Sequence, residues 1–261
     1  MENNTQQCGG CHFMSQQEKV ALFVTCLVDQ MMPEVGINTV KLLRRAGYEV
    51  TFPPEQVCCG QPFFNSGFRE EAKTLARATI DTLAEETAVV LPSGSCTTMI
   101  RQEYPHLFED EPKYYYRALR LAAKSYELGE FLVKIAEWSP ASMAPENETA
   151  ADTITYHDSC HMCRILGLKD EPRQLLTEAG YHIDEMPESN ICCGFGGLFS
   201  VRMKEVSNAM TSKKVNMAND TTAKTLVTSD PGCLMQMRGM LPDDSPLEIE
   251  HISTMLERKT R

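Results

Sequence analysis

The sequence lacks a long hydrophobic run. No stretch of about 18 or more apolar residues occurs, so we expect no membrane span. The N-terminal sequence MENNTQQCGGCHF is polar and has no charged segment followed by an apolar one, so we predict no signal peptide. With neither feature, we expect a cytoplasmic protein.

Positive charge is scarce as well. Lysine and arginine together number 25, aspartate and glutamate 36, and the formal net charge is −11. Because an acidic protein repels a phosphate backbone, we do not expect nucleic acid as a partner. A dinucleotide fingerprint is also missing, since Gly194 and Gly196 would need a third glycine where Phe199 stands. Hydride transfer by this chain alone is therefore not predicted.

Cysteine, by contrast, is abundant: the chain has eleven. In a reducing compartment structural disulfides are disfavoured, and cysteines there serve more often as metal ligands or redox-active groups. Two short sequences, QVCCGQP at residues 56–62 and NICCGFG at residues 190–196, each contain adjacent cysteines followed by glycine. These paired thiols are the first candidates for metal ligands.

Eight of the cysteines follow one pattern that occurs twice. Cys58 follows Cys26 by 32 positions, and Cys192 follows Cys160 by the same 32. The first repeat maps onto the second with an offset of 134 at the first three cysteines and of 137 at the last. The eight residues are Cys26, Cys58, Cys59, Cys96, Cys160, Cys192, Cys193 and Cys233. Such regularity indicates an internal duplication.

The segments around these cysteines also repeat, and they predict an α/β fold. Runs rich in β-branched residues, such as VALFVTC ending at Cys26 and DTITYHDSC ending at Cys160, are typical of strands. Helical periodicities lie between them, the clearest running from Phe68 to Leu83. Because strands that alternate with helices favour parallel βαβ units, we predict two tandem Rossmann-like halves with parallel sheets.

The predicted boundaries follow from composition. We expect a disordered tail over residues 1–18, a first cysteine-rich half over residues 19–145 and a second over residues 146–261. The boundary falls in residues 137–152, a stretch rich in Pro, Ala, Ser and Glu that is typical of a linker. The first half is expected to close with a long helix over residues 113–138, and the second with the strand and helix of LEIEHISTMLERK.

Ligands of open parallel sheets bind beyond the carboxyl ends of the strands, and all eight cysteines follow predicted strands. We therefore expect them at that edge. Adjacent cysteines point in divergent directions, so they chelate a single zinc ion awkwardly and suit an iron–sulfur cluster, which offers several iron atoms. Gly60, Gly194 and Gly196 would let the backbone approach such a cofactor and aim N–H groups at sulfur.

The repeats resemble the cysteine-rich CCG domain that occurs in heterodisulfide reductase and in the iron–sulfur subunit of glycolate oxidase. More closely, LFVTCLVD, CCGQPFFNSG, PSGSCTTM, CCGFGG and GCLM resemble the lactate utilization protein A family, from Val20 to about Glu257. This resemblance implies an iron–sulfur redox subunit of a complex that oxidises L-lactate to pyruvate. It implies two partners, a ferredoxin-like iron–sulfur protein and a third, smaller subunit.

The same resemblance implies that the eight cysteines hold iron–sulfur clusters of the [4Fe–4S] type, one per repeat or one shared. One departure leaves alternatives open. The reductase motif ends in C-x-x-C, whereas Cys96 is followed by Thr-Thr-Met and Cys233 by Leu-Met-Gln. Four thiols suffice for an ordinary cluster. The alternatives are a disulfide-reducing enzyme like heterodisulfide reductase and a zinc-stabilised interaction protein without redox activity. In the favoured interpretation the chain is one component of an oxidoreductase complex.

Three cysteines lie outside the pattern. Cys8 and Cys11 belong to CGGCH, which formally matches a c-type haem attachment site. Haem attachment requires export, so we assign these two to the disordered tail. Cys163 is either a fifth ligand of the second half or a small residue on the first turn of a helix, and we favour the helix.

Two histidines and two arginines complete the candidates. His157 and His161 flank Cys160, and either is a candidate general base toward a 2-hydroxy acid because histidine titrates near neutral pH. Alternatively, the two histidines support the cofactor without binding it, from positions next to its cysteine ligands. Arg164 and Arg202 are candidates for binding a carboxylate through a bidentate contact.

Overall fold

The computed structural model describes residues 18–143 and 152–261. The predicted tail, apart from Glu18, and residues 144–151 of the predicted linker lie outside the described residues, and Cys8 and Cys11 lie there with the tail. No helix within the described ranges combines the length and the apolarity that crossing a bilayer requires.

Each half contains one four-stranded sheet in which every pair of neighbouring strands is parallel. The first sheet has the order β2-β1-β3-β4 and the second the order β6-β5-β7-β8. The strands are β1 (Lys19–Leu22), β2 (Glu49–Thr51), β3 (Val89–Leu91), β4 (Ser125–Glu127), β5 (Thr153–Tyr156), β6 (His182–Ile183), β7 (Thr225–Thr228) and β8 (Glu248–His251). The predicted α/β class with two parallel sheets is confirmed.

Helices connect the strands of both halves. In the first half they are α1 (Cys26–Met31), α2 (Pro33–Arg45), α3 (Gln61–Asn65), α4 (Arg69–Thr82), α5 (Gly94–Thr98), η1 (Met99–Glu103), α6 (Tyr104–Leu107), α7 (Pro112–Ala122), α8 (Leu128–Glu130), η2 (Phe131–Ile135) and η3 (Pro140–Met143). In the second half they are η4 (His161–Leu166), α9 (Asp170–Glu178), α10 (Leu198–Arg202), α11 (Lys204–Asn219), α12 (Pro231–Arg238) and α13 (Ile252–Lys259).

The apolar periodicity explains why these segments are helical. On α4 the buried side chains Ala72, Ala76 and Ile80 recur every four residues, so one stripe of the helix faces the core. Acidic residues occupy its first turn, where they interact favourably with the positive end of the helix dipole. Helix α2 ends just before Gly47, whose φ of +96° suits glycine and stops the helix.

The long helix predicted over residues 113–138 was wrong. Helix α7 ends at Ala122, strand β4 follows, and α8 with the π-helical turn η2 completes the segment. Strand β4 is only three residues long and pairs in parallel with β3, Val90 opposite Tyr126. Its β structure comes from this pairing with a distant strand, which outweighs the local helical preference of its sequence. Strands β4 and β8 thus occupy the same place in the two sheets.

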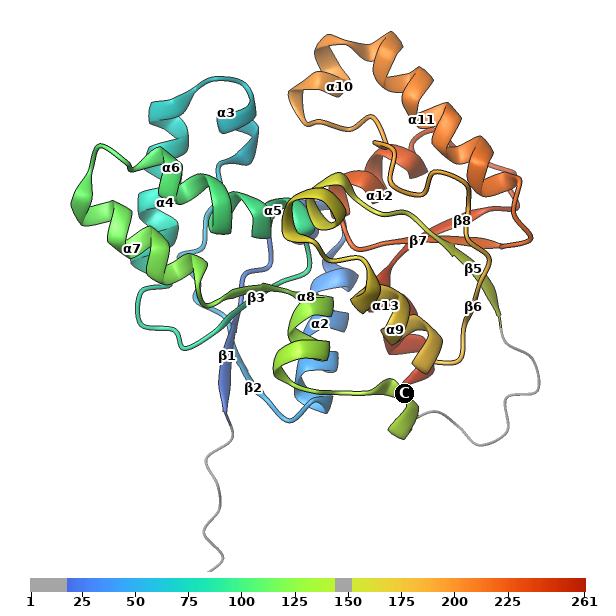
Figure 1. Ribbon diagram of the computed structural model, residues 1–261, viewed down its shortest axis with the longest axis horizontal. Helices are drawn as coiled ribbons and strands as arrows, with labels where there is room; N and C mark the ends of the chain where they lie inside the picture. Colours follow the sequence, from blue (N-terminus) through green and yellow to red (C-terminus); the bar gives the residue numbers. More distant parts are fainter. Residues whose placement is uncertain (1–17, 144–151) are drawn as a thin grey trace, which may run out of the picture.

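The halves pack their helices against each other where they meet. Helix α2 of the first half packs against α13 of the second, and α9 of the second packs against α8 of the first. Figure 1 shows these helices between the sheets, with the first half in blue to green and the second in yellow to red. One hydrophobic core runs through both halves and includes Leu42, Val90, Phe131, Ile154, Leu175 and Ile252. The repeats are therefore halves of one packed unit.

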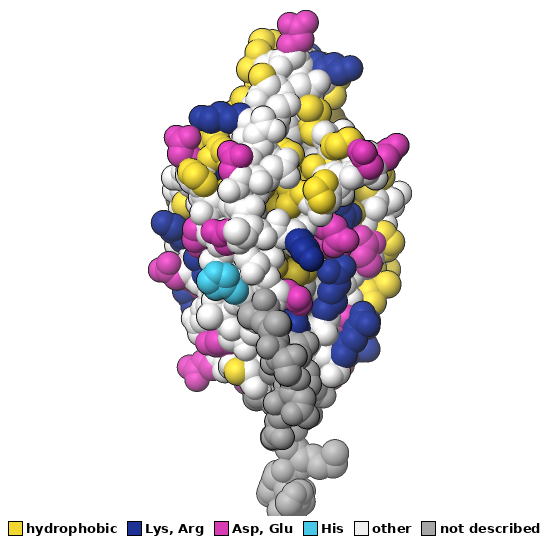
Figure 2. Space-filling view, turned by 90° about the vertical axis from the view of Figure 1, so that its right-hand side faces the viewer, with side chains coloured by type: hydrophobic (Ala, Val, Ile, Leu, Met, Phe, Trp, Pro, Cys, Tyr) yellow, Lys and Arg dark blue, Asp and Glu magenta, His cyan; other side chains and the backbone are white. Residues whose placement is uncertain are grey.

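Charge is mixed over the surface of the second half. Figure 2 shows lysine and arginine interspersed with aspartate and glutamate on the face that carries β5 and β6. On this face no broad basic area stands out.

Candidate metal centre

The cysteines occupy the ends of the strands, as predicted. Cys26 follows β1, Cys96 lies on α5 after β3, Cys160 follows β5, and Cys233 lies on α12 after β7. The two Cys-Cys-Gly triplets follow β2 and β6. Since every strand of each sheet is parallel to its neighbours, these ends meet at one edge.

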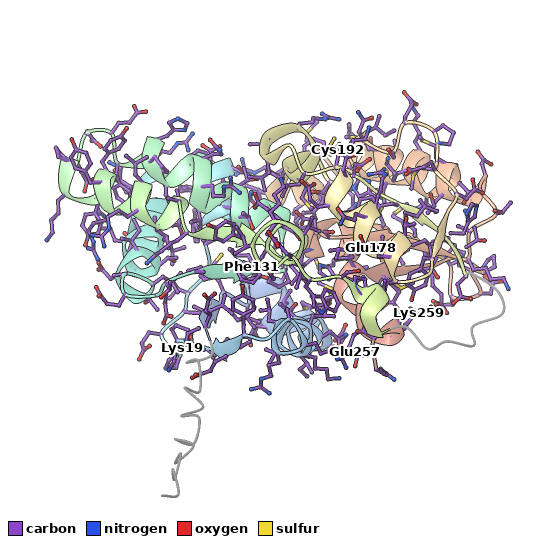
Figure 3. All side chains as sticks on the ribbon, turned by 60° about the horizontal axis from the view of Figure 1, so that its bottom comes forward. Lys19, Phe131, Glu178, Cys192, Glu257 and Lys259 are labelled. Atoms are coloured by element: carbon purple, nitrogen blue, oxygen red, sulfur yellow. The ribbon has the colours of Figure 1, made fainter. Side chains whose placement is uncertain are left out.

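All eight predicted ligands line a single cavity of about 160 Å³ between the halves. Cys192, labelled in Figure 3, belongs to its second-half wall. Other parts of the wall come from α3, α5 and the loop before α10. Cys163 does not line the cavity. Of the cysteines that the structure describes, the eight repeated ones line the cavity and Cys163 does not.

Within each half the sulfur atoms are in contact. The Sγ atoms are 3.5 Å apart for Cys26 and Cys58 and 3.4 Å apart for Cys59 and Cys96. In the second half Cys193 and Cys233 approach to 3.1 Å. The described cysteines are all free, so these contacts are between thiols and not disulfides.

Hydrogen bonds between the thiols select one thiolate in each half. Donation from Cys26 lowers the pKa of Cys58, and donation from Cys160 likewise lowers the pKa of Cys192. The same hydrogen bonds, together with burial, raise the pKa of Cys26 and of Cys160. Each half therefore favours negative charge at the first cysteine of its Cys-Cys pair.

The glycines after the paired cysteines adopt backbone conformations that favour glycine. Gly60, Gly194 and Gly196 have φ angles of +86°, +91° and +52°. The N–H of Gly194 donates to Sγ of Cys192 over 3.4 Å, the kind of backbone contact to sulfur that we predicted there. A cofactor role for these three glycines stays a prediction.

Polar groups from both halves meet at the cavity. The buried carboxylate of Asp230 accepts hydrogen bonds from the N–H and the hydroxyl of Ser95, at 2.8 and 3.2 Å. Burial raises the pKa of Asp230. Nearby, Nε2 of His161 lies 3.3 Å from the side-chain nitrogen of Gln61, and Nδ1 of His161 lies 3.7 Å from the sulfur of Cys160. His161 is thus placed to meet a molecule in the cavity.

His157 is placed differently from His161. It is completely buried and does not line the cavity. Burial lowers its pKa to about 3, so the ring is neutral. Neither ring nitrogen has a hydrogen-bond partner among the described residues, yet one nitrogen and the sulfur atoms of Cys193 and Cys233 all lie within 4.8 Å of one another. The ring therefore faces the sulfur atoms from the interior of the protein.

A buried ion pair fixes the loops that carry Cys160 and Cys192. Arg173 donates to both oxygens of Asp158, at 2.8 and 2.9 Å, and the hydroxyl of Ser189 donates to the same carboxylate at 2.7 Å. Asp158 precedes Cys160 by two residues and Ser189 precedes Cys192 by three. The two segments are thereby held together.

Sequence reasoning missed Lys214 and Asp230. Asp230 lines the cavity, and Lys214 donates to the carbonyls of Glu188 and Ser189, close to Cys192 in the chain. Both are buried, and only the burial of a charged residue, which a sequence does not reveal, identifies them. The predicted carboxylate-binding arginines lie elsewhere: Arg164 donates to the carbonyl of Asn190 at 2.6 Å, and Arg202 is exposed on α10. Carboxylate binding by either arginine stays a prediction.

Comparison with known proteins agrees with this geometry. The sequence model of the CCG family, described as "Cysteine-rich domain", matches residues 20–101 and 154–238, one segment in each half. Lactate utilization protein A of Bacillus subtilis (strain 168) is 45% identical over 243 residues, which are 92% of this chain and 100% of that relative. The protein of the same name from Bacillus licheniformis is 44% identical over the same shares. This chain belongs to the lactate utilization protein A family.

The family assignment confirms the resemblance drawn from the cysteine motifs. A solved structure is also similar, that of a hypothetical protein from Helicobacter pylori, with a TM-score of 0.66 at 10% identity. It covers 93% of this chain and 49% of that chain. At such low identity the likeness shows the fold alone, and the lactate utilization protein A family is assigned from the sequence relatives.

Proposed function

We propose that this protein is the iron–sulfur redox component of a system that oxidises L-lactate to pyruvate. The observation that supports the proposal is the convergence of eight thiols, four from each half, on one cavity. The lactate assignment comes from the name of the relatives, lactate utilization protein A.

The donor set fits iron–sulfur clusters. Four thiols in each half match the four thiolate ligands of a [4Fe–4S] cluster. The sulfur atoms of both halves line one cavity of about 160 Å³. When bound, such a cluster supplies reversible one-electron transfer. Oxidation of lactate removes two electrons and two protons, so two one-electron sites match its stoichiometry.

The protein's own groups prepare the site. Cys58 and Cys192 are the thiols most readily ionised, so they present thiolate for the first bonds to metal. The N–H of Gly194 stabilises negative charge on sulfur. His161 lines the cavity and is the better placed of the two candidate bases, since His157 has no exposed surface. In this proposal His161 takes the hydroxyl proton of a substrate.

Where the reductase motif has its last cysteine, this chain has Met99 in the first half and Gln236 in the second. These two residues bear on the disulfide-reducing alternative. Met99 is buried in the core of the first half. Gln236 donates hydrogen bonds to the hydroxyls of Ser207 and Thr211, at 3.1 and 2.9 Å, and Thr211 in turn donates to the carbonyl of Cys193. Both positions are therefore occupied by side chains that support the fold, which favours four-thiol sites over the five-thiol sites of the reductase.

Zinc is the second candidate, and one observation favours it. The ligand atoms of His157, Cys193 and Cys233 lie within 4.8 Å of one another, and zinc takes mixed histidine and cysteine ligands. A zinc site there would stabilise the second half without redox chemistry, as in an interaction protein.

Metal analysis separates these candidates. The full chain is purified without oxygen, and iron, sulfide and zinc per chain are measured together with the electron paramagnetic resonance spectrum. We expect iron and sulfide, and we expect Cys58→Ser and Cys192→Ser each to lose part of the iron. Cys163→Ser is the matched control, because Cys163 is a described cysteine outside the cavity, and it should retain the full content. Zinc without iron would refute the redox proposal.

The lactate assignment needs a second measurement. In the proposed complex the chain works with a ferredoxin-like iron–sulfur protein and a third subunit. With both partners present and oxygen excluded, L-lactate should bleach the visible absorbance of the iron-loaded chain, and D-lactate serves as the comparison. An iron-loaded chain that L-lactate leaves oxidised in the presence of both partners would contradict the assignment.

A further inference from the structure

The two halves surround their sulfur atoms with different groups, although one duplicated pattern supplies the cysteines. The offset of 134 that maps Cys26 onto Cys160 maps Phe23 onto His157. Phe23 is 1% exposed and His157 0% exposed, so both side chains belong to the interior. The first half thus has a hydrocarbon ring where the second has an imidazole whose two nitrogens have no partner among the described residues.

A second difference lies on the helices that pack against the Cys-Cys-Gly triplets. The backbone carbonyl of Ala72 faces the glycine of the first triplet, and that of Ser207 faces the glycine of the second. Ala72 and Ser207 therefore occupy equivalent positions, 135 residues apart. The same offset of 135 maps Thr79 of α4 onto Lys214 of α11. A neutral hydroxyl in the first half is therefore replaced by an amine in the second.

Lys214 is a buried cation without an acidic partner. Its side chain is 0% exposed, and Nζ donates to the carbonyls of Glu188 and Ser189, both at 3.0 Å. Within the described part of the chain no carboxylate lies at ion-pair distance from this nitrogen. Burial lowers its pKa to about 8, while the neighbouring cysteines and the carboxylate of Asp158 act to raise it. Negative charge at the sulfur site and at Asp158 thus favours the charged form of Lys214.

We infer that the two sites differ in reduction potential and that the second-half site is the more easily reduced. This inference rests on the proposed function, because it presupposes an iron–sulfur group in each half. A reduced group carries one more negative charge, and a nearby cation and N–H donors toward sulfur stabilise that form. Lys214 supplies the cation and His157 a polar imidazole beside Cys193 and Cys233, whereas Thr79 and Phe23 supply neither a charge nor an imidazole.

The consequence is a direction of electron flow. With an iron–sulfur group bound by the cysteines of each half, an electron that entered at the first-half site would pass to the second-half site, which would be reduced as the first was oxidised again. The electron comes from the oxidation of lactate in the complex, and no bond is made or broken in the transfer. Neither His157 nor Lys214 lines the cavity. In this scheme both act from behind the cysteines, Lys214 by supplying charge and His157 as a positioning residue.

The test is a potentiometric titration of the full chain reconstituted with iron and sulfide under anaerobic conditions, followed by electron paramagnetic resonance and visible absorbance. We expect two reduction steps. A Cys26→Ser, Cys96→Ser double variant assigns them, because it removes first-half ligands and should leave the step of higher potential. A single step, two steps of equal potential, or retention of the lower step in this variant would overturn the inference.

Substitution by the first-half residues identifies the cause. Lys214→Thr and His157→Phe should each move the higher step to lower potential and leave the lower step in place. Lys213→Thr is the matched control, since Lys213 is its exposed neighbour and pairs with Glu188 at the surface. Lys214→Arg, which keeps the charge, should preserve the potential. If Lys214→Thr moved neither step, or moved both equally, the assignment to Lys214 would be wrong.

The outcomes distinguish this inference from the proposed function. Zinc without iron refutes the proposed function before any potential is measured. Iron with two equal potentials refutes only the inequality of the sites. Iron content and circular dichroism of each variant establish that it is folded and loaded, and the comparison of the two steps in the unmodified chain does not depend on any substitution.

Discussion

Substituting alanine for each of the two glycines that follow the Cys-Cys pairs tests how tightly each sulfur site is packed. Both have positive φ, +86° at Gly60 and +91° at Gly194, so alanine is strained at either position. They differ in surroundings. A Cβ at Gly194 would lie 2.6 Å from the backbone oxygen of Ser207 and 2.9 Å from the hydroxyl of Thr211. A Cβ at Gly60 meets nothing closer than the backbone oxygen of Ala72, at 3.4 Å.

The magnitudes follow from these contacts. Alanine in the left-handed region costs about 1–2 kcal/mol, and restriction of the unfolded chain offsets about 0.4–1 kcal/mol of this. We therefore expect Gly60→Ala to cost about 1 kcal/mol. At Gly194 the clash with a backbone carbonyl adds about 1–3 kcal/mol of overpacking. At about 2–4 °C per kcal/mol, a cost near 1 kcal/mol lowers the melting temperature by about 2–4 °C and one near 3 kcal/mol by about 6–12 °C.

The assay is thermal denaturation of the reduced, metal-free chain, followed by circular dichroism, with metal content measured separately after reconstitution. Gly194→Ala should also bind less iron than Gly60→Ala, because moving the loop withdraws the N–H of Gly194 from the sulfur of Cys192. Equal shifts in melting temperature, or a larger shift for Gly60→Ala, would refute the packing argument. The positive φ shared by the two glycines would then account for the whole effect.

Three further predictions concern protons and packing. Metal binding should strengthen as the pH rises toward the ordinary thiol pKa of 9.0 and above it in competition titrations, because the pKa values of Cys26 and Cys160 are raised by their hydrogen bonds to neighbouring thiols and by burial, and these protons must leave on binding. Although burial acts to raise the pKa of Glu257, its bonds to Arg261 and Lys41 lower it below the ordinary 4.5, so its contribution to stability is complete above that pH and is lost below it. In acid denaturation the unmodified chain should have a larger free energy of unfolding than Glu257→Gln above pH 4.5, and this difference should disappear at lower pH. Gly94→Ala would place a Cβ 2.2 Å from Cγ of Met162 across the two halves and should cost about 1–3 kcal/mol, part of which Met162→Ala restores in a double-variant melting cycle.

The grouping of the eight cysteines was predictable because duplication leaves a numerical trace. The 32-residue spacing from Cys26 to Cys58 and from Cys160 to Cys192 pointed to equivalent positions, and the rule for parallel sheets placed those positions at one edge. The structure then brought all eight sulfur atoms to one cavity. The division near residue 145 stays a prediction, since it falls within a range that the structure does not describe.

What the sequence did not reveal depends on contacts between distant segments. Strand β4 was missed because three residues carry too little pattern, and its conformation depends on pairing with β3. Lys214 resembles its exposed neighbour Lys213 in the sequence, and only the packing of α11 separates a buried cation from a surface one. The asymmetry of the two sites was hidden for the same reason: it arises from residues that surround the cysteines and not from the cysteines themselves.

Asp230 connects the cysteine-bearing helices of the two halves. It caps α12, which carries Cys233, by accepting from the N–H of Gly232 at 3.1 Å, and its two oxygens also accept from Ser95 on α5. A buried carboxylate requires several donors, and here part of them come from the other half. In the first half the cap of α5 is Ser93, whose hydroxyl accepts from the N–H of Cys96 at 3.3 Å. The second repeat alone would leave Asp230 buried without the donors of Ser95, so the second half is not expected to hold its site alone.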